Sequence, residues 1–328
     1  MLTTTRPPVI AAVAFAVLAV AGCHGSAATD ERRASSIGLG SGGVSFAAVS
    51  GPKPEGRFLA VVSPGGTNDN QLYELRFTPP QLRRLSPTRR VSGVSACQSR
   101  VVVTTGQEDA EASDSLQELQ GEDFASLEGL GSVASAGHPA VGPDCRVAYT
   151  FVNGGGPMTA TELRTWDPAR KRGKTLYRIR PGEGQLLDAS WGPNGEVAVL
   201  HVPFDASGSA GGGQLAKGRP AAVIVVRPNG STVEMDPGTL DPVDLVWGKR
   251  MMAIADGQTR TILLSPNDGK RVTVDGWRPL SWSPEGDTLL VNDATTGRVL
   301  GLLDPDRASV QEIARLTGPV FDVDWLPG

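Results

Sequence analysis

The sequence is poor in the residues that build metal centres, disulfide scaffolds and nucleic-acid interfaces. Its 328 residues include only three Cys and three His, which is too little material for a multi-ligand zinc site. With 31 Lys and Arg against 35 Asp and Glu and no long basic run, the chain is not typical of proteins that neutralise nucleic-acid phosphates. The length is ample for a large apolar core. We therefore expect no cofactor, no metal and no nucleic-acid partner.

Familiar catalytic signatures are also missing. No Gly-x-Ser-x-Gly elbow, no phosphate-binding loop of the Walker type and no His-Glu-x-x-His motif occurs. His138 and His201 have no evident nucleophile beside them in the sequence. We therefore predict that the protein is not an enzyme.

The first residues have the layout of a secretory signal peptide. Arg6 and the amino terminus form a short positive region, and an uninterrupted apolar run follows from Val9 to Val20. This run is shorter than the roughly 20 residues that a transmembrane helix needs. Residues 1–22 are therefore predicted to be a signal peptide.

The end of this segment, Val20-Ala21-Gly22-Cys23, resembles the lipobox of bacterial lipoproteins. The resemblance implies that the Cys23 thiol is lipidated and that the mature chain begins there. Several acyl chains anchor a protein stably where one is marginal. It further implies a location outside the cytoplasm, tethered to the bacterial cell membrane. Residues 23–45, rich in Gly, Ser and Ala, are expected to carry the lipid and serve as a flexible tether.

The remainder, residues 46–328, repeats a unit of a tight turn followed by a short apolar strand. Four of the six Trp occupy one position, just before the turn: Trp191, Trp247, Trp282 and Trp325. A third strand follows in several copies, and a fourth short segment leads to the next. The copies are spaced by roughly 36 to 55 residues, the length of a four-stranded propeller blade.

The stretch from Trp282 to Gly286 (Trp-Ser-Pro-Glu-Gly) resembles the PD40 repeat of TolB-like envelope proteins. The repeat and the resemblance together predict an all-β fold, a β-propeller with six blades of four antiparallel strands. Because Val320–Trp325 has no downstream partner, we expect it to be the innermost strand of the first blade, closing the ring. Alternatives are seven blades, with a degenerate one within 107–136, or an open array of β-sandwiches.

One position, three residues before the Trp, carries candidate binding residues. It holds His138, Asp188, Asp244 and Asp322 in four of the copies. At the mouth of a propeller channel, this ring can bind a cation or a basic group of a partner, and carboxylates held together raise one another's pKa values. The alternative is that Asp caps the preceding turn.

Three other features have both a functional and a plain interpretation. Cys97 and Cys145 occupy equivalent turns, and outside the cytoplasm such a pair tends to form a disulfide. Residues 107–128 are strongly acidic, with a short helix expected to start near Ser113, and either meet a basic partner or form a solvated loop. Arg170, Lys171, Arg172 and Lys174 either touch anionic lipid headgroups or form an ordinary charged turn.

The resemblance implies a function in binding. We expect a monomeric, lipid-anchored, non-catalytic scaffold that binds another envelope protein. The alternatives are a small-ligand or metal-binding propeller with hydrolase- or lactonase-like activity at the channel mouth, and a sensor of a small envelope ligand.

Overall fold

The computed structural model describes residues 35–37, 43–64, 69–86, 90–98, 100–106, 115–130, 138–152, 160–203, 220–239, 241–257 and 259–328. These residues belong to one compact unit, Ala34–Gly328. The predicted signal peptide and the predicted lipidation site, Cys23, lie outside the described residues. Within the described part, no helix is long and apolar enough to span a membrane.

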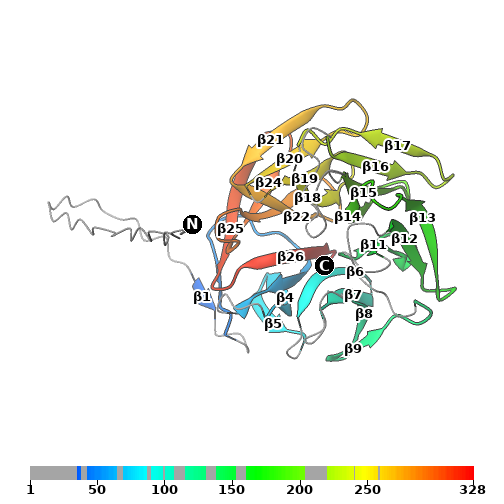
Figure 1. Ribbon diagram of the computed structural model, residues 1–328. Coiled ribbons are helices and arrows are strands. Elements are labelled where there is room, and N and C mark those ends of the chain that lie inside the picture. Colours follow the sequence, from blue (N-terminus) through cyan, green and yellow to red (C-terminus); the bar gives the residue numbers. More distant parts are fainter. Residues whose placement is uncertain are drawn as a thin grey trace, which may run out of the picture. The chain divides into compact units, whose positions relative to one another are not determined.

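Six blades of four antiparallel strands confirm the predicted propeller (Figure 1); five are four-stranded sheets, and the sixth belongs to a six-stranded sheet. In blade order from the inner strand outward, the first three are β26 (Val320–Leu326), β3 (Arg57–Val62), β4 (Gln71–Phe77) and β5 (Pro80–Arg84); β6 (Val91–Cys97), β7 (Arg100–Thr105), β8 (Ser115–Gln120) and β9 (Asp123–Ser126); β10 (Ala140–Val141), β11 (Val147–Val152), β12 (Thr161–Asp167) and β13 (Arg172–Arg178). The last three are β14 (Gln185–Trp191), β15 (Val197–Val202), β16 (Ala222–Val226) and β17 (Thr232–Met235); β18 (Pro242–Trp247), β19 (Met252–Asp256), β20 (Arg260–Leu264) and β21 (Arg271–Asp275); β22 (Trp277–Trp282), β23 (Leu289–Asp293), β24 (Val299–Asp304) and β25 (Ser309–Leu316). A short 3-10 turn, Pro143–Cys145, precedes β11.

The carboxyl-terminal strand closes the ring as predicted. β26 pairs antiparallel with β3, with Trp325 opposite Phe58 and Val323 opposite Ala60. The described part of the acidic segment forms β8 and β9, the two outer strands of blade 2, and not a seventh blade. The short helix expected near Ser113 is therefore wrong where the structure describes it: Ser115–Gln120 is a strand, paired with β7.

The amino-terminal segment makes a second connection between blades 6 and 1, in addition to the pairing of β26 with β3. β1 (Ser35–Ile37) pairs with β2 (Phe46–Ala48), and β2 pairs with the outer strand of blade 6, β25. The Phe46 ring meets Phe77 of blade 1 edge-on, with centroids 5.4 Å apart. Val44 is buried in the same cluster. Part of the segment 23–45, named above as a tether, thus contributes to this sheet and its core.

The core consists of apolar layers between neighbouring blades. Successive side chains of a strand point to opposite faces, so Phe58 and Ala60 of β3 pack against blade 6 while Leu59 and Val61 pack against blade 2. When the second strand of a blade is buried on both faces, its sequence is a continuous apolar run. This explains sequences such as Arg-Phe-Leu-Ala-Val-Val at 57–62.

The repeated Trp has a packing role. The indoles of Trp191, Trp247 and Trp282 each lie on a glycine of the preceding blade: Gly142, Gly192 and Gly248, respectively. A Cβ at any of these glycines would come within 3.0 Å of the ring, closer than real Cβ contacts. The Trp and the glycine form a lock between blades, which we call the Trp–Gly lock.

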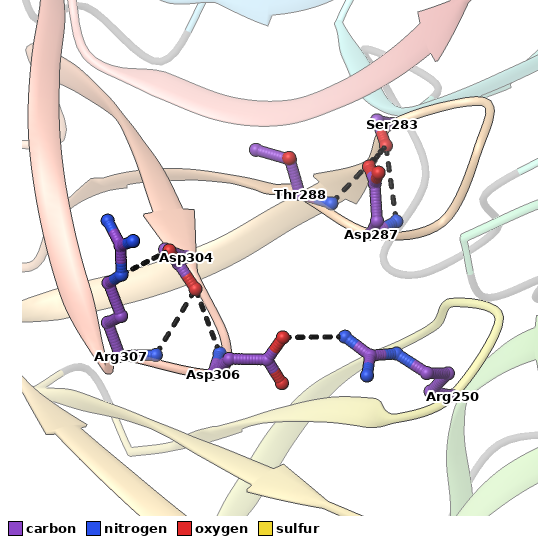
Figure 2. A network of polar contacts seen from close by, with 7 residues as sticks. All are labelled: Arg250, Ser283, Asp287, Thr288, Asp304, Asp306 and Arg307. Carbon is purple, nitrogen blue, oxygen red and sulfur yellow. Dashed lines mark hydrogen bonds and ion pairs between the residues drawn. The ribbon is translucent and has the colours of Figure 1, made fainter.

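Side chains close the turns at the rim, as at Asp304 (Figure 2). Asp304 accepts the backbone N–H bonds of Asp306 and Arg307 at 2.9 and 3.1 Å, the geometry of an Asx turn. Asp306 then pairs with Arg250 of the neighbouring blade at 2.9 Å. The turn that ends blade 6's third strand is thereby tied to blade 5.

Candidate functional site

A cavity of about 230 Å³ lies between the inner strands of the six blades, and residues of every blade line it. His138, Asp188 and Asp322 are among the lining residues, while Asp244 is not. All four interact electrostatically, since His138, Asp244 and Asp322 each affect the ionisation of Asp188. The structure therefore brings the predicted ring together.

Asp188 and Asp322 make the same pair of hydrogen bonds. One carboxylate oxygen accepts a backbone N–H from the next blade, that of Leu245 at 2.8 Å for Asp188 and that of Val94 at 2.7 Å for Asp322. The other oxygen accepts the N–H of the following residue in its own strand, at 2.9 Å in both cases. Each carboxylate sits at a β-bulge, and each fastens two inner strands together.

A second row of side chains, one residue before the Trp position, continues this fastening. Three Ser hydroxyls and one carboxylate accept the backbone N–H at the Trp position of the next blade: Ser190 from Trp247, Ser281 from Trp325, Ser95 from Val141 and Asp324 from Ala96. The two remaining blades carry Ala140 and Val246 at this position. There the indole of the next blade donates to the backbone carbonyl instead: Trp191 to Ala140 at 2.9 Å and Trp282 to Val246 at 3.1 Å.

All six junctions therefore have a polar bond between inner strands. The sequence reasoning above missed this second row. The signal was present in the residue before the Trp position: where that residue has no acceptor side chain, as at Ala140 and Val246, the indole N–H of the next blade bonds to its backbone carbonyl instead.

Asp244 differs from its counterparts because it forms an ion pair with Arg278 of blade 6. Both side chains are about one-fifth exposed, at 22% and 20% respectively. Arg278 supplies a positive charge that the sequence reasoning did not assign to the site. His138 packs against Gly93, where a Cβ would lie 3.0 Å from the imidazole.

Burial governs the ionisation of the carboxyl groups. Loss of water raises the pKa of Asp188 to about 7, with the charge of His138 opposing this rise. Burial likewise raises the pKa of Asp324 to about 7, against the hydrogen bond from the Ala96 N–H. The pKa of Asp322 is also raised by burial. Near neutral pH the site thus carries protons as well as negative charge.

The arrangement favours hydrogen bonding over metal coordination. Among the residues that the structure describes, no group of three or more His, Cys, Asp and Glu is placed to hold a metal ion. The carboxylates of Asp188 and Asp322 each already accept two backbone N–H hydrogen bonds, one on each oxygen.

An exposed aromatic residue stands next to this ring. Phe321 directly precedes Asp322 and lies within the bulge of β26. It is 43% exposed, the only large hydrophobic side chain with such exposure in the described part of the chain. No pattern in the sequence distinguished it, since the adjacent Val320 and Val323 are equally apolar and are buried.

A second cavity, of about 660 Å³, lies on the side of the tight turns. Its wall contains the three locked indoles, with Pro143, Pro193 and Pro284 from the tight turns. Trp191, Trp247 and Trp282 also line the smaller cavity, so the indoles separate the carboxyl ring from the turn side.

The two cysteines join blades 2 and 3. Cys97 and Cys145 form a disulfide with their Cα atoms 5.6 Å apart. Cys97 takes the position of the lock glycine, and Val141 takes the position of the Trp that would lie on it. Cys145 takes the place of the turn glycine, with a φ of 54°. The Trp–Gly lock joins three of the six pairs of neighbouring blades, and the disulfide joins one of the pairs that lack it.

The acidic segment 107–128 lies partly outside the described residues, which omit 107–114. In the described part, Glu118 pairs with Arg100 at 2.8 Å and Glu128 pairs with Lys171. These acids therefore form ion pairs within the propeller.

Comparisons with known proteins support the fold. In sequence, the chain matches no family model and no curated protein. Among solved structures, TolB from Acinetobacter baumannii is similar with a TM-score of 0.59 at 14% identity, over 83% of this chain and 67% of that one.

Two propeller enzymes are more distant. A puromycin-hydrolyzing peptidase of Mycobacterium tuberculosis has a TM-score of 0.49 at 14% identity, over 86% of this chain and 45% of that one. Oligogalacturonate lyase from Vibrio parahaemolyticus has a TM-score of 0.47 at 11% identity, over 82% and 81%. These values are too low to bear on activity. The chain is thus a six-bladed β-propeller whose fold is similar to that of TolB.

Proposed function

We propose that this protein is a lipid-anchored, extracytoplasmic β-propeller that binds another envelope protein at its channel mouth and has no catalytic activity. The signal peptide and the lipobox-like residues ending at Cys23 support the anchor. The TolB-like fold supports a place in the cell envelope by analogy, and fold alone does not give function.

The observation that carries this proposal is the exposed Phe321 beside the buried carboxyl ring. Aromatic side chains exposed at a rigid surface are typical anchors of protein interfaces. The cavity beneath, at about 230 Å³, is smaller than the roughly 300–1,000 Å³ of small-molecule sites. It is suited to a single side chain of a partner.

The chemistry of the cavity favours a cationic side chain. Asp188, Asp322 and Asp324 line it, and His138 is the only basic residue among its lining side chains. A Lys or Arg entering here would meet carboxyl groups and would promote the loss of their protons. A partner loop with a basic residue next to an apolar one fits both Phe321 and the ring.

The test is capture of a partner from the native envelope, using the full mature chain as bait. We expect one protein to be recovered by the unaltered bait and by Phe321→Leu, which keeps an apolar side chain, but not by Phe321→Ser. Equal recovery with Phe321→Ser would contradict the proposal. Cys23→Ser should in addition release the protein from the membrane fraction.

A second candidate is hydrolase- or lactonase-like activity at the same mouth. It is favoured by one observation, the pKa of about 7 at Asp188, which suits a general acid or base. Turnover of a panel of lactones and esters that disappears in Asp188→Ala, in a chain that is still folded, would favour the enzyme. A ligand-induced rise in melting temperature without turnover would favour a sensor.

A further inference from the structure

The outer edge of blade 3 has the highest density of positive charge on this acidic protein. Between residues 168 and 182 there are six Lys and Arg and no Asp or Glu: Arg170, Lys171, Arg172, Lys174, Arg178 and Arg180. The chain as a whole has a net charge of −4. Most of these cations lie on β13 or in the turn before it.

β13 is exposed in a way that the other outer strands are not. Four consecutive residues, Arg172 to Thr175, are exposed, whereas no other outer strand of a blade has two exposed residues in succession. Because alternate side chains point to opposite faces, this part of β13 is uncovered on both faces. It extends beyond the layers that bury the rest of the blade.

Half of these cations lack an internal counter-charge. Arg170, Lys171 and Arg178 pair with Asp167, Glu128 and Glu162, respectively. Arg172, Lys174 and Arg180 form no ion pair with any residue that the structure describes. Arg172 and Lys174 are two residues apart, so their side chains lie on one face of the strand.

The backbone of this edge is also unpaired. β13 is the last strand of the sheet β10-β11-β12-β13, and no described strand follows it. Blade 6 differs, because β2 and β1 cover its outer strand. An edge strand presents alternate N–H and C=O groups outward, which can pair with an added strand. Basic residues on an edge discourage such pairing by neutral or basic strands, but they favour an acidic one.

We propose that β13 is a docking edge for an acidic, extended segment of a partner protein. The segment adds as a further strand to blade 3, with its carboxylates facing Arg172 and Lys174 and a further contact at Arg180. This surface is separate from the channel mouth and from Phe321.

The position of the edge favours a protein over a lipid surface. The amino-terminal strands attach to β25 of blade 6, and Figure 1 shows β25 and β13 on opposite sides of the ring. Cys23 precedes Ser35 by twelve positions in the sequence. The chain that follows the proposed anchor therefore joins the propeller at blade 6, across the ring from β13. This choice rests on the proposed anchor, whereas the binding test below does not.

The experiment uses the full chain carrying Cys23→Ser, which cannot be acylated there, and a labelled synthetic peptide in which Glu alternates with Val and Thr. We expect binding that weakens as salt is added. The triple variant Arg172→Glu, Lys174→Glu, Arg180→Glu should bind at least about tenfold more weakly. A control with the same charge change on other blades, Arg90→Glu, Arg227→Glu, Lys270→Glu, should bind as the parent does. Circular dichroism should show both variants folded, because all six side chains are exposed.

Two further measurements test whether the peptide adds as a strand and whether the edge binds lipid instead of protein. A peptide methylated on alternate backbone nitrogens should lose binding if it adds as a strand; equal binding overturns strand addition. Vesicles of phosphatidylcholine and phosphatidylglycerol, three to one, should not distinguish the triple variant from its control. If the triple variant loses vesicle binding but keeps the peptide, the edge is a lipid surface and the proposal is wrong. Phe321→Ser should leave peptide binding unchanged, so failure at the mouth is separable from failure here.

Discussion

Removal of the disulfide between Cys97 and Cys145 tests how much the junction of blades 2 and 3, which has no Trp–Gly lock, depends on this bond. The two residues are 48 apart in sequence. In the chain-entropy model, opening a loop of this size lowers the free energy of unfolding by about 4 kcal/mol. This junction has no Trp–Gly lock that could compensate, because Cys97 and Val141 stand where three other junctions have the glycine and the Trp. The hydrogen bond from the Val141 N–H to Ser95, at 2.9 Å, would still join these inner strands.

We therefore expect Cys97→Ser with Cys145→Ser to lose about 2–4 kcal/mol of unfolding free energy, measured by urea denaturation followed by Trp fluorescence. Thiol titration of the denatured, unreduced parent should find one free thiol per unlipidated chain. A control variant with the third cysteine replaced, Cys23→Ser, should unfold like the parent.

A rescue variant sharpens the test. Cys97→Gly, Val141→Trp and Cys145→Gly together rebuild the Trp–Gly lock at this junction, and should recover stability relative to the double Ser variant. A loss below about 1 kcal/mol in the double Ser variant, well under the range typical of native disulfides, would refute the reasoning. So would a rescue variant less stable than the double Ser variant.

Three other changes address the channel and the locks. Asp188→Ala removes the acceptor of the Leu245 N–H and should cost about 1–3 kcal/mol of unfolding free energy, measured in urea; an unchanged midpoint would show that the carboxylate does not fasten the strands. Burial raises the pKa values of Asp188 and Asp324 to about 7. Between about pH 4 and about pH 7 the folded state therefore holds protons on these carboxyl groups that the unfolded state releases. The free energy of unfolding should fall as pH rises through this range. Denaturation at about pH 5 and about pH 8 should show this fall, and Asp324→Asn should reduce it; a steeper fall in that variant would contradict the assignment. Gly192→Ala places a methyl group 2.7 Å from the Trp247 indole and should destabilise the fold by about 1–3 kcal/mol. The control Gly173→Ala, whose methyl group would make only ordinary contacts at 3.5 Å or more, should cost less by calorimetry.

The propeller was predictable because its signals are local and repeated. A tight turn, a strand buried on both faces and a Trp before the turn occur in successive copies, and the unpaired last strand indicated closure, which β26 and β3 confirm. The addition of β2 to blade 6 was not predictable. The segment Phe46–Ala48 is short, and its partner is more than 260 residues away in sequence.

The sequence predicted where the residues of the candidate site lie better than it predicted their hydrogen bonds and ion pairs. Three of the four ring residues line the cavity, because they share one place in the repeat. The sequence could not show that Asp188 and Asp322 bond to the next blade, since this depends on how the inner strands approach one another. It also could not show the ion pair of Asp244 with Arg278, or that Phe321 is exposed where its apolar neighbours are buried.

Two sets of strand pairings, β2 with β25 and β26 with β3, determine how a force applied to the amino-terminal end would act on the propeller. A pull on the residues before Ser35 would first act on the pairings of β1 with β2 and of β2 with β25. These strands can be stripped one bond at a time while β26 stays seated on β3. The hairpin of β1 and β2 would therefore separate from blade 6 under force before the pairing of β26 with β3, which closes the propeller, is disrupted.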